Sequence, residues 1–199
     1  MRYCPTPEER AARWRAAGIP DGYTISQLFY NSASQVLIVE LCGMKEGNLP
    51  RRLLVRHKSV DKYAPVGSPE EDVSFEYPVT CENRPILVFN SMRMRRNPEG
   101  RRMGRDWNGL YAFNLQTTDL SLCVQPNDFP MPAPYDERGW IAKVIGLSDD
   151  ACHAYVKVGL GIRQDEGEIK SVYYDYHIAR LNLESRELKL ISRLENTWF

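Results

Sequence analysis

The chain has 199 residues, of which 43% are hydrophobic and 26% are charged, and its 26 basic and 26 acidic residues cancel. These values are typical of one globular domain with a sizeable core, and they exclude a chain that is strongly basic or acidic overall. No run of about eighteen apolar residues occurs, so the sequence predicts no membrane-spanning helix. Any electrostatic binding surface must therefore come from a local cluster of charges.

The five cysteines are widely spaced and contain no C-x-x-C pair: Cys4, Cys42, Cys81, Cys123 and Cys152. An odd, scattered set is typical of reduced thiols and not of a disulfide framework or a zinc site. The first residues also lack the apolar core of a secretory signal. The sequence therefore predicts a cytoplasmic protein with no metal and no cofactor.

A short helix is predicted at the start of the chain. Thr6 is placed as its N-cap, Pro7 as its first residue and Glu9 as the partner in a capping box. The helix is expected to reach about Ala17 and to end at Gly18. Residues 1–22 thus form an N-terminal helix and linker ahead of a single β domain at 23–199.

From residue 23 on, short runs rich in Val, Ile, Leu, Tyr and Phe alternate with polar turns. This pattern is typical of β-strands, and no second amphipathic helix is predicted. The runs form three groups, at 24–66, 73–124 and 140–192. The sequence predicts an all-β fold in which each group is a four-stranded antiparallel meander, so that the domain has about three meander repeats.

Two segments of the chain match each other closely, NLQTTDLSL at 114–122 and NLESRELKL at 182–190. Each is predicted to be a hairpin, and together with the strand rhythm they resemble the blades of β-propeller proteins. The resemblance implies a propeller-like arrangement. Because propellers usually have at least about four blades, an incomplete ring, a ring completed by a second copy, a curved open meander and a sandwich all remain open.

In an up-and-down meander, alternate connections lie at the same end of the strands. The connections between second and third strands, at 43–50, 91–107 and 163–171, are longer than the intervening turns. They are predicted to form a long-loop face, and loops on a rigid β scaffold commonly carry binding residues.

The loop at 91–107 holds six arginines, which are Arg93, Arg95, Arg96, Arg101, Arg102 and Arg105. Arginine suits bidentate pairing with phosphate or carboxylate, and Trp107 nearby is placed to stack on a base. Residues 61–82, however, carry six acidic residues and one lysine. Internal pairing or solvation of the arginines is therefore favoured over an acidic protein partner or a nucleic acid.

Two further segments are candidates for contact with a partner. The proline-rich connection at 125–139 is predicted to be extended, with Phe129 and Tyr135 exposed as a recognition edge. Large aromatic residues also end the chain, and Trp198 and Phe199 are expected to dock into the protein's own sheet.

The candidates for chemistry are few. Asp175 and His177 are two apart on a predicted strand and share one face, which is half of a general-base arrangement. No serine elbow, P-loop or H-E-x-x-H motif accompanies them, so a structural pair is favoured. The sequence predicts a non-enzymatic protein-interaction module that uses the long-loop face. The alternative is a binder of nucleic acid or of a phosphorylated ligand through 93–105. No membrane partner is expected, and a homo-oligomer remains open.

Overall fold

The computed structural model describes residues 6–43, 49–68, 70, 72–166 and 169–195. Their β-strands form three four-stranded antiparallel sheets, in each of which the strands neighbour one another in chain order. The prediction of an all-β meander fold is confirmed. The first sheet holds β1 (Tyr23–Asn31), β2 (Val36–Gly43), β3 (Arg52–His57) and β4 (Ala64–Pro65). The second holds β5 (Val73–Thr80), β6 (Ile86–Arg96), β7 (Arg102–Asn114) and β8 (Leu120–Val124). The third holds β9 (Gly139–Leu147), β10 (His153–Glu166), β11 (Ile169–Asn182) and β12 (Leu188–Leu194).

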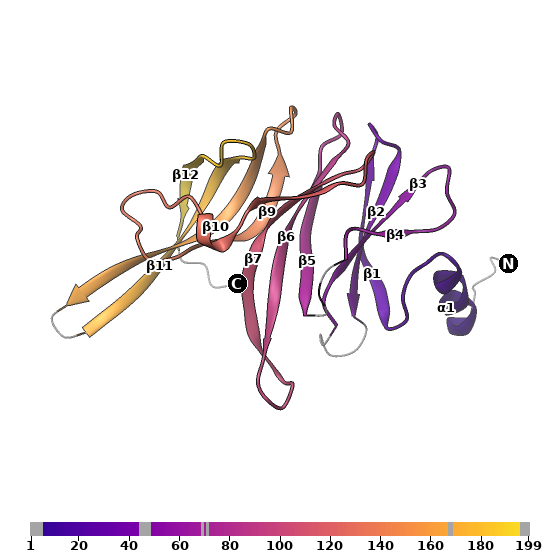
Figure 1. The fold of residues 1–199 in the computed structure, drawn as a ribbon, viewed down its shortest axis with the longest axis horizontal. Helices are drawn as coiled ribbons and strands as arrows, with labels where there is room; N and C mark the ends of the chain where they lie inside the picture. Colours follow the sequence, from indigo (N-terminus) through magenta and orange to yellow (C-terminus); the bar gives the residue numbers. More distant parts are fainter. Residues whose placement is uncertain (1–5, 44–48, 69, 71, 167–168, 196–199) are drawn as a thin grey trace.

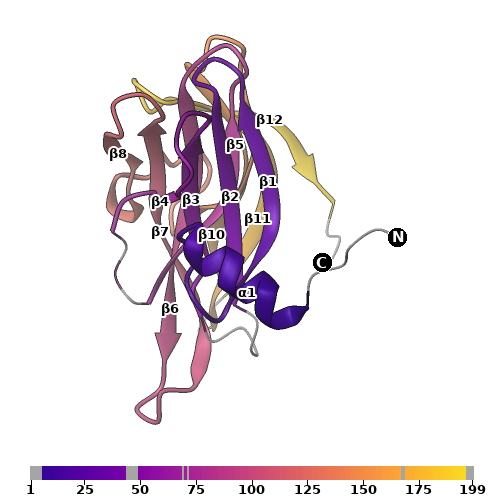
Figure 2. The same cartoon turned by 90° about the vertical axis from the view of Figure 1, so that its right-hand side faces the viewer.

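The sheets stand face to face in a row that follows the chain (Figure 1). The helix α1 (Pro7–Ala16) lies at the β1–β4 end of the row, and β9–β12 forms the other end. Figure 2, viewed along the row, shows α1 in front of the first sheet with the other two sheets behind it. A short 3-10 helix, η1 (Pro126–Asp128), begins the connection from β8 to β9.

The N-terminal helix has the predicted ends. Thr6 caps it through its side chain, which accepts a hydrogen bond from the Glu9 amide, and the Glu9 carboxylate accepts one from the Thr6 amide. Ala17 is the C-cap, and Gly18 follows with a φ of 89°. Trp14 packs against the outer face of the first sheet, on the side of Val39 and Leu41.

The middle sheet is buried on both faces, and its strands divide their side chains between two cores. Leu87 and Phe89 of β6 face the first sheet, where they pack with Ile38 and Leu53. Val88, between them, faces the third sheet. The strand β7 alternates in the same way, because successive side chains of a strand point to opposite faces.

Two buried asparagines join the sheets through polar contacts. Asn31, in the first sheet, donates through its amide nitrogen to the Thr80 hydroxyl and to the carbonyls of Cys81 and Arg84. Asn90, in the second sheet, donates to the Ile141 carbonyl of the third, 2.8 Å away. A buried amide must find partners, so these contacts favour one alignment of each sheet on the next.

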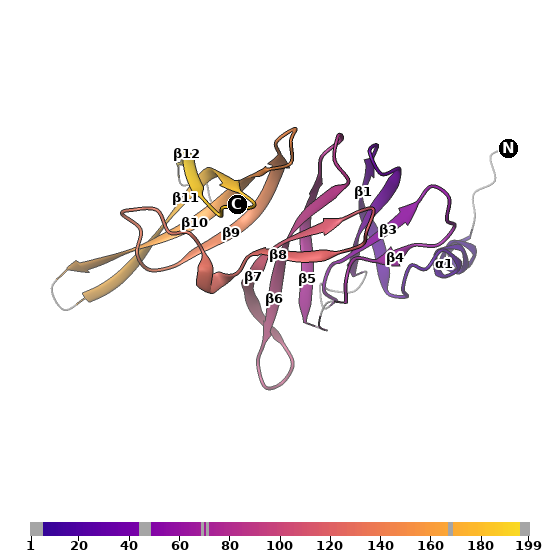
Figure 3. The same ribbon diagram turned by 45° about the horizontal axis from the view of Figure 1, so that its top comes forward.

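The third sheet diverges from the second along its length. The strand β9 contacts β5, β6 and β7, whereas the connection at 125–138 fills the space farther out. Figure 3 shows this connection passing from β8 toward β9. Phe129 and Met131 occupy the space over Gly139, where a Cβ would overlap both side chains. A glycine is required at that position because the packed side chains approach the strand backbone closely.

The two matching segments form the same turn. Asn114 and Asn182 each accept two backbone N–H groups through the side-chain oxygen, from Gln116 and Thr117 in one turn and from Glu184 and Ser185 in the other. Thr118 and Arg186 close the two turns, each at a φ of 62°. The sequence match thus reflects a repeated β7–β8 and β11–β12 hairpin.

Phe89→Ala is expected to lower the free energy of unfolding by about 3–5 kcal/mol, since it leaves a cavity in a closed core. Phe89 is fully buried and its ring lies 4.6 Å from that of Phe75. The matched control is Leu28→Ala on β1, which is 57% exposed and should change stability by no more than about 0.5 kcal/mol. Urea denaturation of both variants measures the difference, and equal losses would contradict the placement of the core.

Candidate functional site

The arginine segment is a hairpin and not the long loop predicted. The strand β6 continues to Arg96 and β7 begins at Arg102, so that only a short turn separates them. The described residues at 163–166 and 169–171 likewise belong to β10 and β11, which pair with each other. Backbone pairing continues because both segments keep a partner strand in register. Both hairpins extend from the end of the sheets opposite the β5–β6 and β9–β10 turns (Figure 1).

Three of the six arginines are held by acidic side chains. Arg93 contacts Glu70 at 2.9 Å and Asp72 at 3.8 Å, and Arg95 contacts Asp106 at 3.2 Å. Arg105 pairs with the buried carboxylate of Glu76. The acidic segment 61–82 therefore supplies partners to the arginine hairpin, as the charge balance indicated.

The other three arginines differ in what holds them. Arg96 donates to the Gly100 carbonyl within the turn. Arg101 is exposed. Arg102 is in β7, and its side chain lies outside the described part of the structure.

The aromatic residues predicted to lie on the binding surface are buried instead. Trp107 is 4% exposed and Phe129 is 8% exposed. Their rings meet edge to face, with centroids 5.4 Å apart, between the second and third sheets. The prediction that Phe129 is exposed on a recognition edge is wrong, because the proline-rich connection packs its apolar side chains between the second and third sheets. The predicted docking of Trp198 and Phe199 lies outside the described residues.

Arg105→Ala is expected to destabilise the protein by about 1–3 kcal/mol, because it removes an ion-pair partner from the buried Glu76. Arg101→Ala, in the same hairpin, is the matched control and should shift stability by less than about 0.5 kcal/mol. Thermal unfolding of both variants tests the assignment. A loss in Arg101→Ala as large as in Arg105→Ala would show that Arg105 has no special structural role.

Tyr135 joins the connection at 125–138 to the third sheet through a polar cluster. Its hydroxyl donates to Asp175 Oδ2 at 3.0 Å and lies 2.7 Å from His177 Nε2. Arg193 of β12 holds the other oxygen of Asp175 at 2.6 Å. The prediction that Asp175 and His177 share a face is confirmed by these contacts.

The protonation states of this cluster suit a structural link. Burial lowers the pKa of His177 below its ordinary value of 6.5, opposed by the charge of Asp175 and assisted by that of Arg193. Burial and the hydrogen bond to Asp175 raise the pKa of Tyr135. The phenol has one proton, which it donates to Asp175, so it accepts the Nε2 proton of a neutral imidazole. Nε2 of His177 then carries a proton, and the phenol of Tyr135 stays un-ionised at neutral pH.

Tyr135→Phe is expected to lower the free energy of unfolding by about 1–3 kcal/mol, since Asp175 and the buried His177 both lose a hydrogen bond. Tyr30→Phe is the control, because Tyr30 is 54% exposed on β1. Urea denaturation compares the two variants. No difference between them would mean that the cluster does not hold the connection in place.

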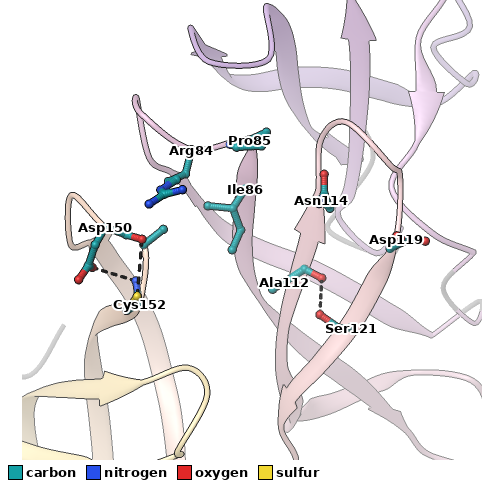
Figure 4. A pocket seen from close by; sticks show the side chains of 10 residues that line it. Arg84, Pro85, Ile86, Ala112, Asn114, Asp119, Ser121, Asp150 and Cys152 are labelled. Atoms are coloured by element: carbon teal, nitrogen blue, oxygen red, sulfur yellow. Dashed lines mark hydrogen bonds between the residues drawn. The ribbon is translucent and has the colours of Figure 1, made fainter.

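An open groove of about 580 Å³ lies between the β7–β8 hairpin and the β9–β10 turn (Figure 4). Several of its polar groups are already used within the protein. Asp150 accepts hydrogen bonds from the Ser148 hydroxyl and the Cys152 amide, which lower its pKa, and the Ser121 hydroxyl donates to the Ala112 carbonyl. The Asp150 carboxylate and the Ser121 hydroxyl in the groove are therefore engaged in contacts within the protein.

The outer face of the third sheet, the face turned away from β5–β8, is open. Each inner face of the row packs on a neighbouring sheet, and α1 with its linker packs on the outer face of the first sheet. Among the described residues, no element lies over the outer face of β9–β12.

One half of this outer face is aromatic. Trp140 is opposite Gly159 on β10, which in turn is opposite Tyr176 on β11. The Trp140 ring meets those of Tyr174 and Tyr176 nearly edge to face, with centroids 5.2 and 5.9 Å apart. A Cβ at Gly159 would overlap the Trp140 ring, so the indole lies directly on the strand backbone. Tyr174 remains 44% exposed.

The other half of the outer face is cationic. Lys157 is opposite Ile178, and Arg180 stands between Tyr155 and Lys189 in the next row. Lys157 Nζ lies 5.0 Å from the centroid of the Tyr176 ring and so joins the two halves. Lys143 stands at the edge, where its Nζ lies 5.7 Å from the Tyr77 ring. In the rows from Tyr155 to Gly161 the register places no acidic residue on this face, whereas Asp165, farther along β10, is opposite Lys170.

The sequence analysis missed this face, although its signal is present. Residues 154–161 alternate between core residues and the series Tyr155, Lys157, Gly159 and Gly161. A strand that faces solvent on one side shows this alternation. The alternation does not indicate whether another element covers the polar side of the strand.

No group of three or more histidine, cysteine or acidic side chains is placed to hold a metal ion within the described ranges. No helix in the described part of the chain is long and apolar enough to cross a membrane. Cys42, Cys81, Cys123 and Cys152 are free thiols, and Cys4 lies outside the described residues.

The chain matches no protein-family model and no curated protein sequence. Among solved structures it is similar to MPT-4, a mannose phosphorylase from Leishmania mexicana, determined in complex with phosphate ion. The similarity has a TM-score of 0.30 and 11% sequence identity, and it covers 85% of this chain and 69% of the other. A likeness of this size carries no argument about activity.

Proposed function

We propose that this protein is a non-enzymatic binding module and that the outer face of β9–β12 is its binding surface. The observation that carries the proposal is an open sheet face whose rows from Tyr155 to Gly161 hold lysine and arginine and no acidic residue. Lys157, Arg180 and Lys189 have no ion-pair partner among the described residues. A partner with an anionic surface complements this face.

The proposal treats the three sheets as successive blades of an incomplete propeller. Each sheet is a meander, and neighbouring sheets pack face to face in chain order. Propellers typically have about four to eight blades, so an array of three ends in an uncovered face. A protein partner, the first expectation from the sequence, remains a prediction, and an acidic protein would meet the same charges.

The proposal includes no enzymatic role because of the protonation states of two sets of groups, the Tyr135–His177 pair and the Cys123 thiol. The Tyr135–His177 pair is held in a neutral hydrogen-bonded link. Burial raises the pKa of the Cys123 thiol to about 11, which leaves little thiolate at neutral pH. The thiol is therefore a poor nucleophile.

The charge-reversal variant Lys157→Glu/Arg180→Glu/Lys189→Glu tests the proposed surface. Wild-type protein is expected to be retained on immobilised heparin, a general polyanion, and this variant to elute at much lower salt. The control Arg95→Glu/Arg96→Glu/Arg101→Glu makes the same change of net charge on the arginine hairpin. It should elute close to wild type. Retention lost only in the hairpin control would move the surface to 93–105 and overturn the proposal.

A further inference from the structure

Building on the proposed function, we propose that the ligand of the outer face is single-stranded nucleic acid. The bases would stack on the aromatic half, around Trp140 and Tyr174, and the phosphates would contact the cationic half, around Lys157 and Arg180. The two halves share one face of four adjacent strands, so a single extended ligand can contact both.

The aromatic half has the features that base stacking requires. Gly159 lets the Trp140 ring lie on the backbone of β10, and at Gly161 a Cβ would come within 3.0 Å of the Tyr174 ring. Glycines in the middle of a strand weaken it, and they commonly mark a close approach of another group. Here Gly159 leaves room for the Trp140 ring against the strand, and Tyr174 beside it stays 44% exposed. Exposed aromatic rings on a sheet stack unpaired bases with little dependence on sequence.

The cationic half lies within reach of the same strand of nucleic acid. The outward positions of β10 from Tyr155 to Gly161 span about 20 Å at roughly 3.3 Å per residue. Lys157 lies between the aromatic rows and the row of Arg180 and Lys189. Phosphates that follow stacked bases across the sheet would therefore meet several cations in turn.

Other occupants fit this face less well. A fourth sheet would need an apolar surface such as that of Ile38, Leu53 and Phe89 in the first interface, but Lys157 stands in the middle of this face. A second copy packed face to face would oppose like charges. A duplex keeps its bases stacked inside, so the aromatic half would gain nothing from it.

The experiment is fluorescence anisotropy with labelled single-stranded RNA and DNA of one sequence, the corresponding duplex, and labelled heparin. Single strands are expected to bind at least tenfold more tightly than the duplex. Tyr174→Ala is expected to weaken single-strand binding by about 5- to 150-fold, the range for one lost stacking contact. Tyr173→Ala is the matched control, because the neighbouring Tyr173 is 51% exposed and points to the opposite face.

The charge-reversal variant at Lys157, Arg180 and Lys189 separates the phosphate contribution. Loss of three phosphate contacts should reduce the slope of log K against log salt by about 2 for single strands. Lys157→Gln is a milder second variant, because it removes one positive charge and introduces no negative one. It should weaken single-strand binding without abolishing it. Circular dichroism checks that each variant is folded.

The outcomes distinguish the two proposals. If heparin, duplex and single strands bind alike and Tyr174→Ala binds as wild type does, the nucleic-acid inference is overturned while the anionic-partner surface stands. No binding to any of these polyanions would overturn both. Selective loss in Tyr174→Ala, with Tyr173→Ala unaffected, supports the inference, and the RNA and DNA arms then identify the preferred strand.

Discussion

The rest of the structure depends on the middle sheet being buried on both faces. Each of its strands must supply apolar side chains to two cores at once, which β6 does with Leu87 and Phe89 on one side and Val88 on the other. A strand buried on both faces loses the alternation of apolar and polar residues, as the run ILVF at the start of β6 shows. That requirement places the middle sheet between the other two. Only the outer faces of the two end sheets can then face solvent or another element.

The outer faces of the first and third sheets differ in what covers them, and this difference creates the candidate surface. At one end the helix α1 and its linker cover part of the outer face of β1–β4 through Trp14 and Ile19, while Leu28 and Tyr30 on the same face stay exposed. At the other end the outer face of β9–β12 combines aromatic rings, of which that of Tyr174 is exposed, with lysine and arginine. The connection at 125–138 instead fills the inner side of that sheet, where Tyr135 is tied to Asp175 and His177. The sheet is thus held from within, and its outer face stays available.

The arginine hairpin shows why a cluster of charged residues in the sequence does not by itself predict a binding site. Arg93 and Arg105 meet acidic side chains that come from the segment before and within β5. Sequence analysis recognised both charged segments, but their distances depend on how β5, β6 and β7 align. The sequence did not predict the cationic half of the outer face, because Lys157, Arg180 and Lys189 are far apart along the chain. They come together only because β10, β11 and β12 are adjacent.

The sequence by itself determined the capped helix, the strand rhythm and the repeated hairpin turns, because these depend on contacts within a few residues. Thr6 with Glu9, and the Asn114 and Asn182 turns, are local hydrogen-bond patterns that short motifs specify. Only the tertiary structure decided that Trp107 and Phe129 are buried, that the arginine segment is a hairpin, and which sheet face is open. These depend on the packing of one sheet on the next, which joins residues distant in the chain and which no local pattern encodes.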